Sequence, residues 1–262
     1  MSKERLKQII TDLSTSYDIN SMDDNDFYKA IIGIYKKEYH PLSLFEFEDH
    51  RKALWDQGIF AGPSACGESF LMYSHNLPRG KNIRFYLNAH DAESARKIIV
   101  STVKELEEKR FRIKTIGHGN YGYDRYDNIV VYVNINEGVR YTANVLQKIS
   151  NENKELFDDK IPFTTKKIAK GVGYGISVDS VNYNILGNQI RCYNKISFNE
   201  LHAFVLDIIF KEFEEKKIDD LDEKVELYSQ ALEQANFDPE NIHFILGVND
   251  PLEDLVLTKF SE

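Results

Sequence analysis

Hydrophobic positions follow two different spacings between residues 82 and 133, and this stretch predicts the centre of the fold. Apolar and polar side chains alternate along residues 83–87 and 111–116, as expected for strands of a half-exposed sheet. Between them, residues 92–109 have apolar side chains at helical spacing, and Asp91 stands at the expected N-cap. A glycine-rich loop at 117–122 precedes a third predicted strand at 128–133. We therefore expect three strands of one sheet covered by a helix.

Helical spacing recurs outside this stretch. It predicts helices at residues 4–13, 26–39, 43–57, 139–157, 197–216 and 222–235, and the start of another at 184–193. We expect Phe45, Leu54 and Trp55 to anchor the third of these helices. Ser197 and Glu200 have the spacing of a capping box. Residues 68–75 are predicted as an edge strand, and residues 162–175 as a basic, glycine-rich loop.

These elements predict an α+β fold with a small, mostly antiparallel sheet flanked by helices. We expect a helical N-terminal extension over residues 1–60, followed by an α+β domain over residues 61–262. The length of 262 residues and the hydrophobic content of 42% are sufficient for a substantial core. The two cysteines have no metal-ligand spacing, and the charged N-terminus lacks a signal-peptide core. We expect a cytoplasmic protein with no membrane contact.

The formal net charge of -9 disfavours nonspecific nucleic-acid binding, which needs a dominant positive field. A local basic site is still compatible with that total. Arg84 and Lys114 lie on two predicted strands of one sheet, and Arg125 follows the glycine-rich loop, so the three side chains are expected within reach of one another. Such a group suits a phosphate or another small anion. The alternative is an ordinary polar face of a half-exposed sheet.

Two further basic residues, Lys166 and Lys167, stand in the predicted loop at 162–175. The spacing of a nucleotide-binding P-loop is missing there, and a solvated surface loop is the alternative. His118 lies in the glycine-rich loop close to Arg125. No HExxH motif, nucleophile elbow or kinase motif occurs in the sequence, so we predict neither a metal site nor a cofactor.

Several cations with acids and bases nearby fit the β-elimination of phosphate from phosphoserine or phosphothreonine. Arginine or lysine would hold the phosphate and stabilise the charge of the leaving group. A lysine whose pKa is lowered by neighbouring arginines can remove the Cα proton, and a histidine or tyrosine can protonate the departing oxygen. Neither a metal nor a nucleotide is required.

Several motifs resemble the HopA-type type III effector family. They comprise the strand at 83–88, Tyr123-Asp124-Arg125-x-Asp127, Pro162-Phe163-Thr164, Lys170-Gly171-Val172-Gly173, Arg191-Cys192 and Phe237-Asp238-Pro239-Glu240. Some members are plant-pathogen effectors. Others are encoded beside kinase-like proteins of lanthipeptide and thioamide-peptide pathways, where the kinase phosphorylates a precursor peptide and the HopA-like protein is taken to eliminate phosphate. This resemblance implies a phosphorylated precursor peptide and a separate kinase-like protein as partners.

The chain is also distantly similar to the OspF/SpvC phosphothreonine lyases. That similarity implies phosphate binding by Lys114, Arg125 and Arg191. The positions of that group's catalytic lysine and histidine are here Arg84 and Tyr86, and arginine scarcely deprotonates. The substitute bases are Lys114, Lys166 and Lys167, and the substitute acids are Tyr86, Tyr123 and His118.

Our leading hypothesis is therefore a phosphoserine/phosphothreonine lyase that produces dehydroalanine or dehydrobutyrine. We expect Lys114, Tyr86 and His118 to be catalytic. We expect the phosphate to be bound by Arg84, Arg125, Arg191, Lys166 and Lys167. The alternative is a catalytically weak scaffold, an effector-like protein that binds the peptide or the kinase.

Overall fold

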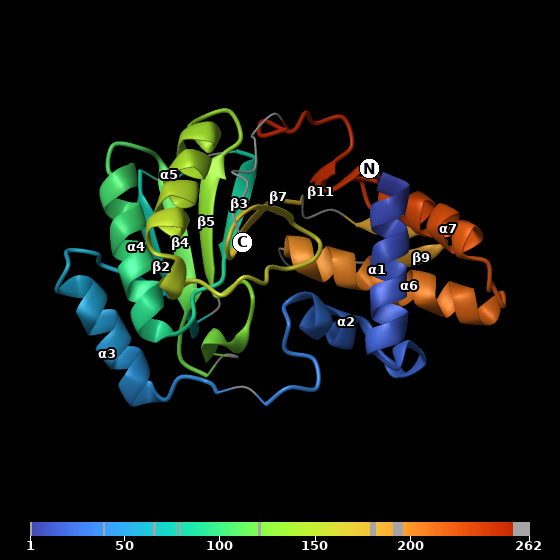
Figure 1. The fold of residues 1–262 in the computed structure, drawn as a ribbon, viewed down its shortest axis with the longest axis horizontal. Helices are drawn as coiled ribbons and strands as arrows, with labels where there is room; N and C mark the ends of the chain where they lie inside the picture. The colour runs from blue at the N-terminus through green and yellow to red at the C-terminus, as the bar shows by residue number, and fades with distance from the viewer. Residues whose placement is uncertain are drawn as a thin grey trace. The chain divides into compact units, whose positions relative to one another are not determined.

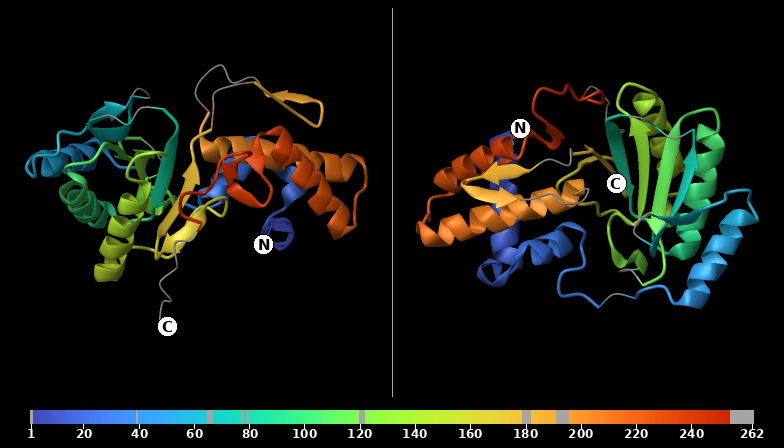
Figure 2. Two further views of the ribbon diagram at one scale, coloured as in Figure 1. Left: turned by 90° about the horizontal axis from the view of Figure 1, so that it is seen from above. Right: turned by 180° about the vertical axis from the view of Figure 1, so that it is seen from behind.

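A computed structural model describes residues 2–38, 40–64, 67–76, 78, 80–119, 122–178, 182–190 and 196–253. The chain forms two compact units (Figures 1 and 2). The first combines Met1–Ile31 with Ile176–Asn249, and the second combines Ile32–Gly175 with Asp250–Glu262. The predicted division at residue 60 stays a prediction. In the structure, the first two helices associate with C-terminal helices, and the third packs on the helix after the third strand.

The second unit is built on a seven-stranded sheet with the order β1-β2-β4-β5-β3-β7-β6. Its strands are β1 Gly62–Ser64, β2 Gly67–His75, β3 Asn82–Leu87, β4 Phe111–Ile116, β5 Ile129–Asn134, β6 Lys166–Ala169 and β7 Val172–Ile176. Its helices are α3 Leu44–Trp55, α4 Ala92–Leu106 and α5 Val139–Glu152, with short 3-10 turns at Gly122–Asp124 and Lys154–Leu156. This architecture confirms the predicted α+β class with an antiparallel sheet.

The sheet has one apolar face and one polar face at its centre. In β3, β4 and β5 the side chains of Ile83, Phe85, Ile113 and Val131 are almost fully buried, and α4 and α5 contact these strands (Figure 1). The view from behind shows the strands in front of these two helices (Figure 2). Because side chains alternate along a strand, Arg84, Lys114 and Tyr132 belong to the opposite face.

The first unit is mainly helical. It contains α1 Ser2–Ser16, α2 Asp24–Ile31, α6 Phe198–Glu215, α7 Leu221–Gln234 and a 3-10 turn at Ile19–Ser21. Two small hairpins pair β8 Tyr183–Ile185 with β9 Asn188–Ile190, and β10 Phe237–Asp238 with β11 Asn241–Ile245. Phe27 of α2 stacks on Phe210 of α6 with ring centroids 5.4 Å apart. Ser197 and Glu200 form the predicted capping box at the start of α6.

Two of the predicted helices differ from the structure. The helix predicted over 26–39 ends at Ile31, and Gly33 just beyond it has a φ of +83°, which is left-handed backbone. In α3 the predicted anchors Phe45 and Trp55 are wrong, since they are 75% and 43% exposed. The buried side chains of this helix are Phe47, His50 and Leu54.

Three further predictions are corrected, and each concerns a segment that is a strand or hairpin in the structure. The segment predicted as a basic, glycine-rich loop at 162–175 contains the hairpin of β6 and β7, most of which is buried. The helix predicted to start at residues 184–193 is the β8–β9 hairpin instead. The strand β2, predicted to lie at the sheet edge, instead pairs with β1, which forms that edge.

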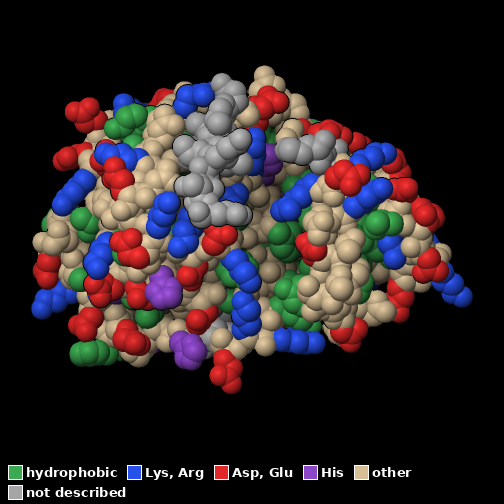
Figure 3. All heavy atoms as spheres, in the orientation of Figure 1, with side chains coloured by type: hydrophobic (Ala, Val, Ile, Leu, Met, Phe, Trp, Pro, Cys, Tyr) green, Lys and Arg blue, Asp and Glu red, His purple; other side chains and the backbone are tan. Residues whose placement is uncertain are grey.

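Charged side chains of both signs are interspersed on the surface drawn in Figure 3. Within the described part of the chain, no helix is both long enough and apolar enough to span a bilayer.

Candidate functional site

The polar face of the central sheet brings together three of the residues predicted for the site. The strand β5 lies between β3 and β4, with Val130 opposite both Tyr86 and Lys114, and Tyr132 opposite Arg84. Directly opposed residues of antiparallel strands point to the same face, so Arg84, Tyr86 and Lys114 share one face. With strands about 4.8 Å apart, β3 and β4 are roughly 10 Å apart across β5, a distance that two long side chains can span.

Arg125 joins this group through the ring of Phe70 on β2. The Lys114 Nζ atom lies 3.4 Å from the ring centroid of Phe70, and the Arg125 Cζ atom lies 5.8 Å from the same centroid. Cations are attracted to the electron-rich face of an aromatic ring. Phe70 therefore gathers a lysine from β4 and an arginine from the loop before β5. We call Arg84, Tyr86, Lys114 and Arg125 the cationic face.

Arg125 is only 4% exposed and forms a two-point ion pair with Asp127. Its Nε atom donates to Oδ1 over 2.5 Å, and its Nη2 atom donates to Oδ2 over 3.0 Å. This fork geometry orients the guanidinium plane. It also compensates part of the positive charge, so the cationic face carries less net charge than its basic residues alone suggest.

Tyr86 and Arg84 are neighbours on β3. Tyr86 is 3% exposed, and this burial raises the pKa of its phenol, an effect that the nearby Arg84 guanidinium partly opposes. The phenol therefore stays protonated at neutral pH and keeps a proton to donate. The Arg84 guanidinium lies over the ring of Tyr132, with its Cζ atom 5.3 Å from the centroid.

The other candidate acids belong to different surroundings. The His118 ring packs against Phe47 of α3, with centroids 6.3 Å apart, and no contact between His118 and the cationic face is found among the described residues. The Tyr123 hydroxyl lies 3.2 Å from the Thr115 Oγ1 atom and 3.1 Å from the His50 Nε2 atom. Thr115 is next to Lys114 in β4, so its side chain points to the opposite face of the sheet. The Tyr123 hydroxyl therefore lies on the side of the sheet that the helices cover.

The two lysines of β6 are ion-paired with acidic residues. The Lys166 Nζ atom lies 3.1 Å from Asp250, which also accepts a hydrogen bond from the Tyr174 hydroxyl over 2.7 Å. Lys167 pairs with Asp159 over 2.5 Å. Neither contact connects these lysines to the cationic face. Arg191 lies outside the described residues.

No role in the site is predicted from the sequence for three residues that shape this region: Phe70, Asp127 and Asn128. The ion pair of Asp127 could have been predicted from the sequence, because an acidic residue two positions after an arginine can form a two-point ion pair with it. The contacts of Phe70 could not, since they require the pairing of β2 with β4. Among the described residues, no group of three or more His, Cys, Asp or Glu side chains is placed to hold a metal ion.

Comparisons with known proteins agree with this fold. The model of the HopA1 effector protein family matches residues 64–244, more than half of the chain. The structure is similar to that of the effector protein from Pseudomonas syringae pv. tomato strain DC3000, with a TM-score of 0.58 and 14% identity over 93% of this chain and 96% of that chain. It is also similar to the effector protein from Pseudomonas syringae pv. syringae strain 61, with a TM-score of 0.57 and 14% identity over 94% of this chain and 98% of that chain.

At 14% identity, these two likenesses show a shared fold and nothing about activity. A comparison with curated protein sequences returns no significant match. The family match covers the central strands, the loop with Arg125 and Asp127, and helices α4 to α7, and so confirms the resemblance drawn from the sequence. The chain belongs to the HopA1 effector protein family.

Proposed function

We propose that the protein is a phosphoserine/phosphothreonine lyase that acts on a peptide phosphorylated by a separate kinase. The observation that carries the proposal is the placement of Arg84, Tyr86 and Lys114 on one sheet face, with Arg125 held beside Lys114 by Phe70. Two cations at the Phe70 ring, a third over the Tyr132 ring and one buried phenol match the parts that phosphate elimination needs.

In this proposal, Arg84 and Arg125 bind the phosphoryl oxygens. Arginine suits this role because its planar donors match the geometry of a phosphate and stay charged at every physiological pH. Arg191 is expected to contribute to the same site, on the basis of the sequence resemblance alone. Lys166 and Lys167 are less suited to it, since each already pairs with a carboxylate.

Lys114 is the proposed base. In its neutral form it takes the proton from Cα of the phosphorylated residue, the electron pair forms the Cα=Cβ double bond, and the Cβ–O bond breaks with release of phosphate. In general, positive charges close to a lysine favour its neutral form, because they disfavour a further positive charge. Tyr86 is the proposed acid, which donates its phenolic proton to the leaving oxygen. His118, packed on Phe47, is a weaker candidate for this step.

One observation favours the second candidate function, a scaffold that binds the peptide or the kinase without turnover. The Arg125–Asp127 ion pair reduces the net charge available to a phosphate. A weakly charged site would still bind an extended phosphopeptide but would stabilise the departing phosphate less.

The test uses synthetic phosphoserine and phosphothreonine peptides with a chelator and without nucleotide. The lyase proposal predicts loss of one phosphoric acid per phosphoresidue, seen by mass spectrometry together with release of inorganic phosphate. Arg125→Ala is expected to lose about 2–4 kcal/mol of transition-state stabilisation, which is a rate decrease of at least about thirtyfold. Binding of the phosphopeptide without any mass loss would favour the scaffold, and absence of binding would contradict both candidates.

A further inference from the structure

The part of the loop that carries Arg125, residues 122–128, is fixed at several points. Gly122 has a φ of +66°, and a Cβ atom added there would lie 2.0 Å from the carbonyl oxygen of His40. The Asp124 carboxylate accepts a hydrogen bond from the His40 amide over 2.7 Å. The backbone amide of Tyr126 donates a hydrogen bond to the Ile32 carbonyl over 2.9 Å. Surface loops are usually mobile, so this many fixed points indicate a function for the geometry of the loop.

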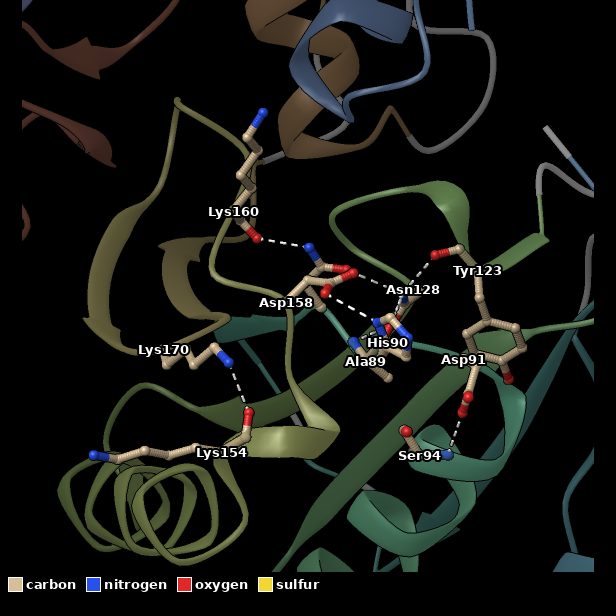
Figure 4. Close-up of polar contacts among 11 residues, drawn as sticks. Ala89, His90, Asp91, Ser94, Tyr123, Asn128, Lys154, Asp158, Lys160 and Lys170 are labelled. Carbon is tan, nitrogen blue, oxygen red and sulfur yellow. Dashed lines mark hydrogen bonds and ion pairs between the residues drawn. The ribbon is translucent and has the colours of Figure 1, made fainter. Parts of the chain in front are cut away.

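Asn128 closes this loop with its side chain. The amide is 1% exposed and lies between the loop and the turn after β3 (Figure 4). Its Nδ2 group, which has two protons, lies within hydrogen-bond distance of three acceptors: the carbonyl oxygens of Tyr123 at 3.1 Å and Ala89 at 2.8 Å, and Oδ1 of Asn88 at 3.3 Å. Its Oδ1 atom accepts from the Ala89 amide over 2.8 Å. Because a backbone amide can only donate and a carbonyl can only accept, these contacts determine the orientation of the side-chain amide.

The other end of the loop is held by a directional hydrogen-bond chain. The Thr115 hydroxyl donates to the Asn128 carbonyl over 3.2 Å, so its oxygen must accept the proton of the Tyr123 hydroxyl. The Tyr123 oxygen must then accept from Nε2 of His50, 3.1 Å away. The chain assigns the proton of neutral His50 to Nε2 and connects α3 to the start of β5.

Between these two anchored ends, Arg125 and Asp127 point toward each other rather than toward the anchors. We infer that Asn128 is a positioning residue: together with the His50–Tyr123–Thr115 chain, it holds the Arg125–Asp127 pair in register with Lys114. This inference rests on the proposed phosphate-binding role of Arg125 for its effect on catalysis. Its effect on the loop itself does not depend on that role.

The test compares Asn128→Asp and Tyr123→Phe with Asn153→Ala. In Asn128→Asp, a carboxylate replaces the donor group and faces three acceptor oxygens, so the loop should open. Tyr123→Phe removes only the hydroxyl, and it still tests the inference if Asn128→Asp does not fold. The control residue Asn153 donates to the Ile149 carbonyl over 3.0 Å in the same unit, and no hydrogen bond joins its side chain to residues 122–128.

Hydrogen exchange of the amides at 122–128 and 88–90 is expected to accelerate in Asn128→Asp and Tyr123→Phe and to stay at the wild-type rate in Asn153→Ala. The kcat of phosphate elimination should fall between about tenfold and a hundredfold in the two loop variants, because a shift of about 1 Å in a binding group has effects of this size. Unchanged exchange in both loop variants would overturn the inference, as would accelerated exchange with an unchanged kcat. If wild-type protein does not eliminate phosphate but the loop amides still exchange faster, the proposed function fails and the positioning of the loop by Asn128 stands.

Discussion

The guanidinium of Arg125 and the carboxylate of Asp127 form a buried two-point ion pair within a single loop. Breaking a buried pair leaves one charge without compensation, which destabilises proteins by about 3–5 kcal/mol. We therefore expect Asp127→Asn to lower the free energy of unfolding by an amount in this range, measured by urea denaturation. Glu105→Gln is the matched control, because the Glu105–Lys148 pair is solvent-exposed and is expected to contribute less than about 1 kcal/mol. Equal losses of unfolding free energy in the two variants would contradict the claim that burial makes the Arg125–Asp127 pair important for stability.

Acid should destabilise the protein through His50. This histidine is fully buried, and burial lowers its pKa to about 4. Between pH 6.5 and pH 4 the unfolded chain binds a proton at this position and the folded chain does not. The free energy of unfolding therefore falls as the pH falls through this range, by about 3 kcal/mol in total for this group.

The measurement is urea unfolding at several pH values for wild type and His50→Gln, since glutamine retains an N–H donor for Tyr123. The variant should show a smaller loss of stability between pH 6.5 and pH 4. His90→Gln is the control, because the exposed His90 has its pKa raised by the Asp158 carboxylate and contributes with the opposite sign (Figure 4). A pH dependence in His50→Gln identical to that of wild type would refute this assignment.

Gly33 should tolerate no side chain. Its φ is +83°, and a Cβ atom would lie 2.2 Å from the ring of Tyr126. Gly58 has a similar φ of +77° with nothing within 4 Å, so Gly58→Ala isolates the backbone strain of about 1–2 kcal/mol. Gly33→Ala should therefore destabilise the protein more than Gly58→Ala, and it should also accelerate hydrogen exchange in the loop that contains Tyr126. Equal midpoints of urea unfolding for the two variants would be inconsistent with this contact.

Lys114 provides a separate test of the base. Lys114→Arg keeps a positive charge over Phe70 but removes a group that can deprotonate at accessible pH. We expect the KM for a phosphopeptide to change by less than about threefold and kcat to fall by at least about a hundredfold, the usual contribution of general base catalysis. Steady-state assays of phosphate release would measure both quantities. A kcat close to that of wild type would assign the base to another residue.

Local signals explain which parts of the fold could be predicted. Asp91 and Ser197 accept hydrogen bonds from amides three residues later, so the starts of α4 and α6 follow from short motifs. Alternation along β3 and β4 was sufficient to place Arg84 and Lys114 on one face. The β6–β7 hairpin was missed because its glycines and lysines have the composition of a loop. Close packing requires these glycines, since a Cβ atom at Gly173 would lie 2.6 Å from Thr165.

Long-range contacts explain the rest. Asn128 precedes a strand, and asparagine is common in turns, so nothing local distinguishes it. Its hydrogen-bond partner Ala89 is 39 positions away in the sequence. Phe70 comes close to Lys114 only when β2 pairs with β4, and to Arg125 only when the loop before β5 folds against β2. In α3, periodicity identified the helix and one buried anchor, Leu54, but not the rest of its buried side, because the fully buried residue of its middle turn is the polar His50.

The central claim is that the cationic face binds the phosphoryl group of a peptide. Calorimetric titration of one peptide, phosphorylated and unphosphorylated, into wild type, Arg84→Met and Lys148→Met tests it most directly. Lys148 is the matched control, because it is an exposed, ion-paired cation on α5. Wild type and Lys148→Met are expected to prefer the phosphorylated peptide, whereas Arg84→Met should lose at least about tenfold of that preference. An undiminished preference in Arg84→Met, or none in wild type, would contradict the claim.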